Sequence, residues 1–228
     1  MILMRLCMPD DPGMLAAVAA TLSEARADFV TIDVVHRADG VVVDNLCLEL
    51  DPSATVTAMR RRVESVAGVS VEVVRHVEAP PSSVDALELA GALTADGGDA
   101  IRILVDGLPR ALNAEWAMAL ELDDEEEVCI LHTSARAPAP PTGTVPWLPL
   151  ATPRRLAVAP WMPTSWRLRS LVAGGLEIAA CPLVTARQAV AVARDNGRFR
   201  PPEIRQLAIL SQLAVRESGR RARVVAVG

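Results

Sequence analysis

Residues 8–40, MPDDPGMLAAVAATLSEARADFVTIDVVHRADG, carry the clearest structural signals in the N-terminal part of the chain. Within this stretch, Asp11 is a good helix N-cap and Pro12 suits a first helical position, which predicts a helix beginning there. Apolar residues then recur at helical spacing and predict one buried stripe, formed by Leu15, Val18, Leu22 and Ala25. Residues 29–36 predict a strand. One face of that strand carries Val30, Ile32 and Val34.

The flanking segments extend this pattern into a small domain. Apolar residues 2–8 predict a strand before the helix. A turn signal at residues 38–40 predicts a hairpin to a further strand over residues 41–50. In that strand we expect three alternating side chains to point inward: Leu46, Leu48 and Leu50.

A second helix and a fourth strand complete the pattern. Asp51-Pro52-Ser53 predicts the start of the helix, and Gly68 predicts its stop. The apolar stripe of this helix consists of Val56, Met59, Val63 and Val66. Residues 69–77 predict the last strand. The order βαββαβ predicts a mixed α/β fold of the class called α+β. Its arrangement would be ferredoxin-like, with an antiparallel sheet and both helices on one face.

Residues 8–40 also resemble the signature of ACT domains. In that family an acidic or amide residue, any residue, Pro and Gly precede the first helix, as Asp10 to Gly13 do here. A short polar residue and an apolar residue begin the next strand, as Asp28 and Phe29 do here. The resemblance covers residues 1–78. One departure is Arg26, where the family often carries Gly, so the helix end must turn without it.

The resemblance implies a site for a free amino acid. The residues that it assigns to the site are Asp10, Asp11, Gly13, Met14, Leu15, Asp28 and Phe29. A helix N-terminus suits a carboxylate, and nearby short polar side chains suit an ammonium. Amino-acid-binding relatives often carry Asn at the positions of Asp10 and Asp28, so we expect neutral or cationic ligands here. The alternative is that Asp10 and Asp11 only cap the helix and Asp28 only starts a strand.

The rest of the chain follows a different pattern. Residues 79–83 predict a linker, because Pro80-Pro81 bars a helix and Ser83 can cap the next one. The segments expected after the linker are helical residues 84–113, interrupted near Gly97-Gly98, strands 116–122 and 128–133 around an acidic turn, irregular residues 135–163, a helix over 164–173, strands 176–183 and 189–194, and a helix over 201–217.

The sequence LEIAACPLVTARQAVAVARDNGRFRPPEIRQLAILSQLAV, residues 176–215, resembles the C-terminal half of a GAF domain. Two apolar strands lead there to a turn, an aromatic residue and a helix packed under the sheet. The resemblance implies a GAF-like sensor or dimerisation domain over residues 84–228. The motif with which some GAF domains bind cyclic nucleotides is not visible, so the ligand stays open.

Three of the four tryptophans lie in or beside the irregular segment: Trp147, Trp161 and Trp166. They could form a lid over a ligand site, or they could anchor a long loop to the domain. We favour the anchor.

Composition excludes several functions. A net charge of −5 argues against broad binding to nucleic acid or anionic membranes. The sequence contains no run of about 18 apolar residues, so it predicts no membrane-spanning helix. The N-terminus lacks a signal-peptide pattern, so the expected location is cytoplasmic. The acidic run 123–127 fits a solvated hairpin better than a cation site.

Motifs for catalysis and metal binding are also absent from the sequence. The three histidines and four cysteines lack zinc spacing, and each cysteine lies in an apolar run that predicts a buried thiol. No nucleophile elbow, Walker A motif or dinucleotide glycine pattern occurs. We therefore expect no metal, no cofactor and no enzymatic activity.

Together these patterns predict a non-enzymatic regulatory protein. The ACT-like domain would sense an amino acid, and the GAF-like domain would bind a second ligand or relay the signal to an unidentified protein partner. The chain is expected to form a homodimer. The alternatives are a ligand-free dimerisation or scaffold protein and, third, an enzyme whose site the sequence does not reveal.

Overall fold

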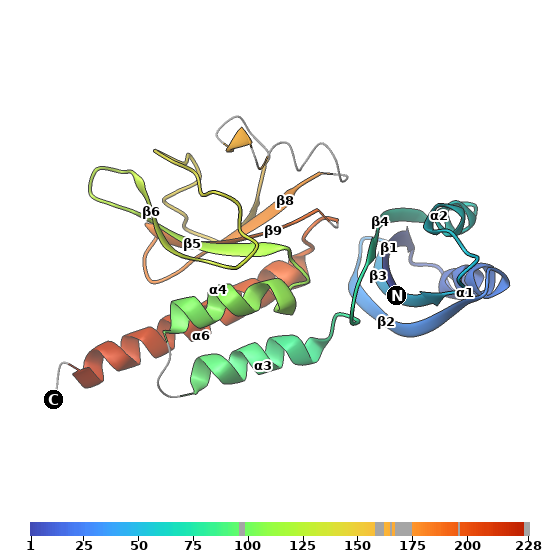
Figure 1. Cartoon of the computed structure of the whole chain (residues 1–228), viewed down its shortest axis with the longest axis horizontal. Coiled ribbons are helices and arrows are strands. Elements are labelled where there is room, and N and C mark those ends of the chain that lie inside the picture. Colours follow the sequence, from blue (N-terminus) through green and yellow to red (C-terminus); the bar gives the residue numbers. More distant parts are fainter. Residues whose placement is uncertain (96–98, 158–161, 165, 167–174, 196, 226–228) are drawn as a thin grey trace. The chain divides into compact units, whose positions relative to one another are not determined.

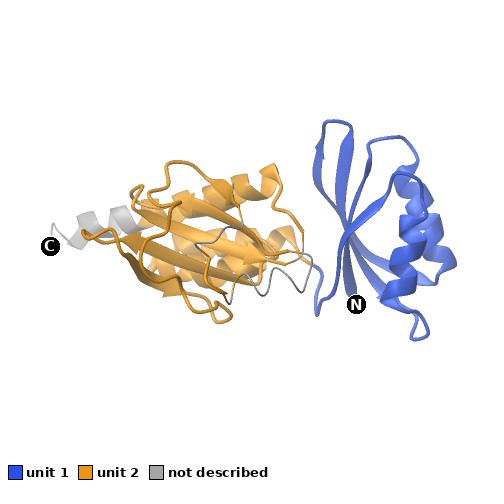
Figure 2. Cartoon of the chain, turned by 90° about the horizontal axis from the view of Figure 1, so that it is seen from above, with its two compact units in different colours: residues 1–80 blue, residues 81–228 orange. Residues whose placement is uncertain are grey.

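The computed structural model describes residues 1–95, 99–157, 162–164, 166, 175–195 and 197–225. It is an α+β structure with two antiparallel sheets. The chain divides into two compact units, residues 1–80 and residues 81–228 (Figure 2).

Unit 1 has the predicted βαββαβ order. Its elements are β1 (Ile2–Pro9), α1 (Met14–Glu24), β2 (Ala27–Ala38), β3 (Val41–Leu50), α2 (Val56–Glu64) and β4 (Ser70–His76). The strands form an antiparallel sheet in the order β2-β3-β1-β4, and both helices cover one face of it (Figure 1). The core between helices and sheet is built from Ile2, Met4, Leu6, Val18, Leu22, Leu46, Leu48, Met59 and Val63, among others.

The start of α1 differs from the prediction. Asp11 does not cap the helix; Gly13 is the N-cap residue, with φ 92° and ψ −9°. Met14 N–H donates to the Asp11 carbonyl at 3.2 Å, so Asp11 to Met14 form a type II turn, with Pro12 and Gly13 in the positions that favour these residues. Pro12 and Gly13 therefore form a turn before the helix instead of its first residues, and α1 begins at Met14, later than expected.

The predicted stripe of α1 is only partly buried. Val18 and Leu22 are fully buried, whereas Leu15, in the first turn of the helix, is 37% exposed. Val30, Ile32 and Val34 are also exposed, at 42%, 44% and 62%. These three residues lie on β2, one of the two edge strands of the sheet, and the β2–β3 register shifts between Phe29 and Thr31, at Val30.

The second helix also begins later than predicted, at Val56 instead of Asp51. The Thr55 hydroxyl caps it by accepting from Ala58 N–H at 3.2 Å. Asp51 Oδ1 instead accepts from the hydroxyl and the N–H of Ser53, at 2.5 and 2.8 Å, and these two hydrogen bonds lower the Asp51 pKa. The Asp-Pro-Ser sequence thus forms a turn ahead of the helix, a common alternative use of Asp.

Arg26, two residues after the last residue of α1, adopts a left-handed conformation with φ 56°, at the position where the ACT resemblance leads us to expect Gly. We expect Arg26→Gly to stabilise unit 1 by about 0.5–1 kcal/mol. Removing a Cβ from this conformation relieves about 1–2 kcal/mol of steric strain, but glycine loses more conformational entropy on folding, which offsets part of the gain. Urea unfolding followed by circular dichroism measures the change. Arg26→Ala is the control: it removes the side chain but keeps the Cβ, so an equal gain there would disprove the explanation.

Unit 2 contains a second sheet with helices on one of its faces (Figure 1). Its described elements are α3 (Ser83–Thr94), α4 (Ala100–Ala111), β5 (Trp116–Leu122), β6 (Val128–Thr133), β7 (Arg154–Leu156), β8 (Glu177–Pro182), β9 (Gln188–Arg194) and α6 (Pro201–Val225). The sheet order is β6-β5-β9-β8-β7, with every pair antiparallel.

Three details of unit 2 correct the prediction. Ser83 is the first residue of α3, and Ser82 caps it in a capping box with Asp85. β7 lies inside the segment expected to be irregular; it has three residues and pairs at the sheet edge, which is too short for a periodic signal. The last helix continues past residue 217 to Val225. The helix expected over residues 164–173 lies almost wholly outside the described residues.

Apolar side chains cover both faces of the second sheet. One cluster packs α3, α4 and α6 on the sheet and includes Leu104, Leu108, Val190, Val192, Phe199 and Leu207. The other cluster lies on the opposite face and contains three tryptophans: Trp116, Trp147 and Trp166.

Candidate functional site

A pocket of about 380 Å³ lies in unit 1 at the N-terminus of α1. Part of its lining comes from the β1–α1 turn and the first residues of α1. The rest includes Val34 and Arg37 from β2 and Val42 and Asp44 from β3. Most of the lining residues are apolar, and their charged groups are Asp10, Asp11, Arg37 and Asp44.

The pocket brings together five of the seven residues predicted for the site: Asp10, Asp11, Gly13, Met14 and Leu15. Asp28 and Phe29 do not line it. Asp28 lies opposite Glu49 at the far end of β2, and Phe29 packs against the core of unit 1. Asp10 lies instead beside the β2–β3 turn, where its N–H donates to the Gly40 carbonyl at 2.9 Å. Within one chain, Asp10 and Asp28 therefore do not form a joint ammonium site.

Arg37 is the actual partner of Asp10. Its Nε donates to Asp10 Oδ2 at 2.7 Å, and this hydrogen bond raises the Arg37 pKa. The Arg37 side chain is 69% exposed and that of Asp10 is 28% exposed, so the pair lies at the pocket rim in contact with solvent. A surface pair of this kind adds little to stability, but it neutralises the Asp10 carboxylate toward a ligand.

Asp44 is the acidic residue of the pocket that the sequence prediction missed. Its residue exposure is 1%, and burial raises the pKa of its carboxyl group. A signal was present in the sequence. Leu46 and Leu48 alternate inward along β3, so the same alternation extended backward by two residues places Asp44 on the buried, helix-covered face.

The first turn of α1 offers hydrogen-bond donors to the same pocket. No described side chain caps the helix, and Ala17 N–H makes the first bond of the helical ladder, to the Gly13 carbonyl at 2.9 Å. The amides of Leu15 and Ala16 therefore precede the ladder, at the positive end of the helix dipole. The pocket thus combines donors suited to a carboxylate with carboxylates suited to a cation.

Metal and membrane sites are not found in the described part of the chain. No group of three or more His, Cys, Asp or Glu side chains among those residues is placed to hold a metal ion. Nor does any helix within the same residues have the length and apolarity needed to cross a membrane. The cysteines are free thiols; Cys47 and Cys181 are buried as predicted, whereas Cys129 is exposed on the edge strand β6.

The acidic run between β5 and β6 forms a hairpin turn, as predicted. Asp123 Oδ1 accepts from the N–H groups of Glu125 and Glu127, at 3.0 and 2.9 Å. These bonds hold the turn and use the Asp123 carboxylate within it. The hydrogen bonding accounts for this acidic residue without a cation.

The tryptophans that the structure describes anchor their loop. Trp147 and Trp166 are 4% and 0% exposed. The ring centroids of Trp166 and Trp116 are 4.8 Å apart, and the Nε1–H of Trp166 donates to the Ala139 carbonyl at 3.0 Å. Trp161 lies outside the described residues.

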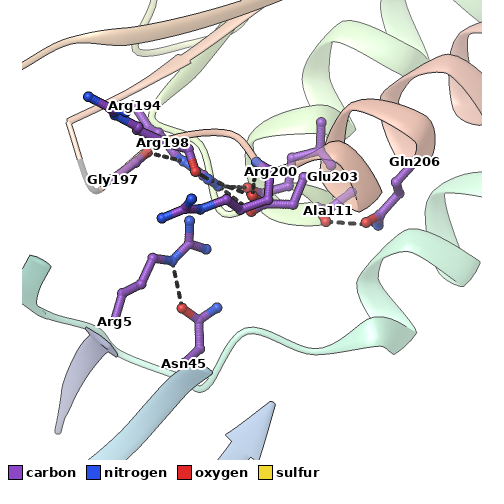
Figure 3. Close-up of polar contacts among 10 residues, drawn as sticks. Arg5, Asn45, Ala111, Arg194, Gly197, Arg198, Arg200, Glu203 and Gln206 are labelled. Carbon is purple, nitrogen blue, oxygen red and sulfur yellow. Dashed lines mark hydrogen bonds and ion pairs between the residues drawn. The ribbon is translucent and has the colours of Figure 1, made fainter. Parts of the chain in front are cut away.

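Arg194 forms the densest polar network in the described part of unit 2 (Figure 3). Its side chain is 0% exposed, and its guanidinium makes a two-point pair with Glu203 at 2.7 and 2.8 Å. The remaining N–H groups donate to the carbonyls of Gly197, Leu112 and Arg198. The guanidinium carbon, Cζ, lies over the Phe199 ring, 4.0 Å from its centre. All five guanidinium donors are used, so we assign Arg194 a structural role.

Comparisons with known proteins give similarities of fold. No protein-family model matches the sequence, and no curated protein matches it. Formyltetrahydrofolate deformylase from Pseudomonas putida is similar over 39% of this chain, with 14% identity and a TM-score of 0.29. The match covers 35% of that enzyme, so this chain spans about a third of its length.

Two further solved structures match larger parts of the chain. The GAF domain of a phosphoenolpyruvate-protein phosphotransferase from Acinetobacter matches 64% of this chain and 95% of its own, with 13% identity and a TM-score of 0.45. The chromophore-binding domain of a bacteriophytochrome from R. palustris matches 87% of this chain and 70% of its own, with 10% identity and a TM-score of 0.43. At these identities the similarity concerns the fold and not a shared ligand.

Proposed function

We propose that the chain is a non-enzymatic regulatory protein that senses a small molecule, and that the α1 pocket of unit 1 binds a free amino acid. The observation that carries this proposal is the pocket itself. An uncapped helix N-terminus and carboxylate side chains line the same apolar cavity of about 380 Å³. The two kinds of group match the carboxylate and the ammonium of a zwitterion.

Unit 2, the GAF-like unit, has the output role in this proposal. It binds a second ligand or relays the signal to a protein partner. We expect no catalytic group to be involved, because the α1 pocket holds no nucleophile or histidine beside its carboxylates and arginine.

The test is a thermal-shift screen of the full chain against the twenty common L-amino acids. A ligand that binds only the folded state adds about 2.7 kcal/mol at 100 times its dissociation constant, so at least one amino acid should raise the unfolding temperature of unit 1. Calorimetric titration then gives the affinity. A flat response to all twenty amino acids would refute the amino-acid proposal.

The alternative function is a ligand-free dimerisation scaffold. The observation in its favour is the edge strand β2, which exposes Val30, Ile32 and Val34 beside unpaired backbone groups. Either function is compatible with a homodimer, so sedimentation should show a dimer at tens of micromolar. The two functions differ in the screen, since a scaffold dimerises through β2 without responding to any amino acid.

A further inference from the structure

Asp44 occupies a position where the fold calls for an apolar side chain. It lies opposite Leu6 on β1 and Val34 on β2, on the sheet face that α1 and α2 cover. The next residues on the same face of β3, Leu46 and Leu48, belong to the hydrophobic core. A carboxyl group at this point therefore needs a reason other than packing.

Among the described residues, one oxygen of the Asp44 carboxyl has no hydrogen-bond partner. Its Oδ1 is buried and makes no hydrogen bond within the described residues. Arg37, the cationic side chain that lines the same pocket, is bound to Asp10 instead. Burial of a carboxylate without a partner is costly, so a buried oxygen of this kind in a native fold calls for an explanation, and a ligand that enters the pocket supplies one.

The surroundings indicate which ligand Asp44 would take. A hard metal ion needs several oxygen ligands, and the described residues contain no such group of three acidic, His or Cys side chains. A single carboxylate in an apolar wall suits an ammonium group. The amides of Leu15 and Ala16, two other residues that line the pocket, suit an anionic group on the same molecule.

We propose that Asp44 binds the amino group of the ligand, and that the pocket therefore selects molecules that carry a cationic amine. This assignment rests on the proposed function for amino acids, but it also applies to amines without a carboxylate. In this arrangement the amine lies at the buried carboxylate, and a ligand carboxylate lies at the α1 amides and near Arg37. Asp10 stays paired with Arg37 at the rim.

The experiment uses the full chain and three sets of probes. These are the common L-amino acids, their 2-hydroxy-acid analogues, in which a hydroxyl replaces the amine, and the primary amines that lack the carboxylate. Wild type should bind members of the first set and fail to bind the matched hydroxy acids. Asp44→Asn should weaken binding of the best amino acid or amine about 10- to 100-fold in calorimetric titration, the usual worth of a hydrogen bond to a charged group.

Asp28→Asn is the matched control, since it also removes an acidic residue of unit 1, at a place outside the pocket. Its affinity for the same probe should equal that of wild type. A loss with Asp28→Asn and none with Asp44→Asn would overturn the proposal.

A stability measurement separates a binding role from a structural one. Burial raises the Asp44 pKa, so the folded chain holds this proton more tightly than the unfolded chain. Wild-type stability should therefore fall as the pH rises from about 4, the unfolded value, through the folded value. Asp44→Asn avoids this loss, so without ligand it should unfold at a higher temperature than wild type at pH 8 and at a similar temperature at pH 4. Asp10, Asp11 and Arg37, the other charged residues of the pocket, are unchanged in this comparison.

Each outcome decides between the proposals. Binding of amines but not of amino acids refutes the proposed function and supports the assignment of Asp44. Equal affinity of wild type and Asp44→Asn for an amino acid supports the function and overturns the assignment. Hydroxy acids that bind as tightly as amino acids overturn it too, as does a lower unfolding temperature of Asp44→Asn at pH 8. If no probe binds, both proposals fail.

Discussion

Replacing Arg194 with methionine is expected to lower the free energy of unfolding of unit 2 by about 3–5 kcal/mol, the usual cost of removing one partner from a buried ion pair. The substitution keeps most of the side-chain volume but leaves the Glu203 carboxylate without its guanidinium. It also removes the donor to the Leu112, Gly197 and Arg198 carbonyls. The network joins the end of β9 to the end of α4 and the start of α6, so its loss acts on three elements at once.

Arg194→Lys tests the geometry of this network. An ammonium has three donors and no flat face, whereas the guanidinium uses five donors and lies over Phe199. The lysine variant should therefore recover only a minor part of the loss. Full recovery would show that the charge alone matters.

Arg155→Met is the control for an exposed pair. Arg155 also contacts a carboxylate at two points, Glu177, at 3.0 and 3.1 Å, but its side chain is 42% exposed. Its loss should cost less than about 1 kcal/mol. Urea unfolding followed by tryptophan fluorescence measures these changes, and it reports unit 2 selectively, because all four tryptophans lie between residues 116 and 166.

Replacing Trp166 with alanine is the second change with a large expected effect, a loss of about 3–5 kcal/mol in the stability of unit 2. The side chain is fully buried, packs on Trp116 and donates a hydrogen bond to Ala139. Alanine leaves a cavity and removes the donor that holds the loop carrying Ala139. Circular dichroism during urea unfolding measures the loss without depending on the deleted fluorophore.

Phenylalanine substitutions separate ring packing from hydrogen bonding. Trp166→Phe loses part of the ring and the bond to Ala139, whereas the Trp116 Nε1 makes no hydrogen bond within the described residues. Trp166→Phe should therefore cost about 1 kcal/mol more than Trp116→Phe, the net worth of one hydrogen bond. A loss of less than about 1 kcal/mol for Trp166→Ala would contradict the anchor role, since removal of a buried large side chain normally costs several times more.

The fold of unit 1 could be predicted because local signals and tertiary structure agree there. The alternation in β3 and the spacing in α2 give the correct elements in the correct order. The sequence predicts helix starts at Asp11 and Asp51, earlier than the structure has them, because Asp occurs in turns as well as at caps and the geometry of the following residues decides between the two. β7 could not be predicted, since a three-residue edge strand depends on its partner β8 and not on its own sequence.

The candidate site could be predicted only where it is contiguous in sequence. Asp10 to Leu15 are neighbours along the chain, so one motif finds them together. Arg37 and Asp44 join them through strand pairing, and their contribution depends on the register of β2 and β3. Asp28 follows the same family motif, but the antiparallel pairing places it at the far end of β2. A sequence motif names the residues of a site but does not show at which end of a strand each residue lies.

The strand order of the two sheets has a consequence for synthesis on the ribosome. All strands of the first sheet come from residues 1–80, so unit 1 can complete its pairing while the rest of the chain is still being made. The second sheet has β9 (Gln188–Arg194) at its centre, between β5 and β8, although β9 is the last of its strands to be synthesised. The edge of β5 that pairs with β9 therefore lacks its native partner until nearly the whole chain has been made, and in that interval it is open to pairing with strands of other nascent chains.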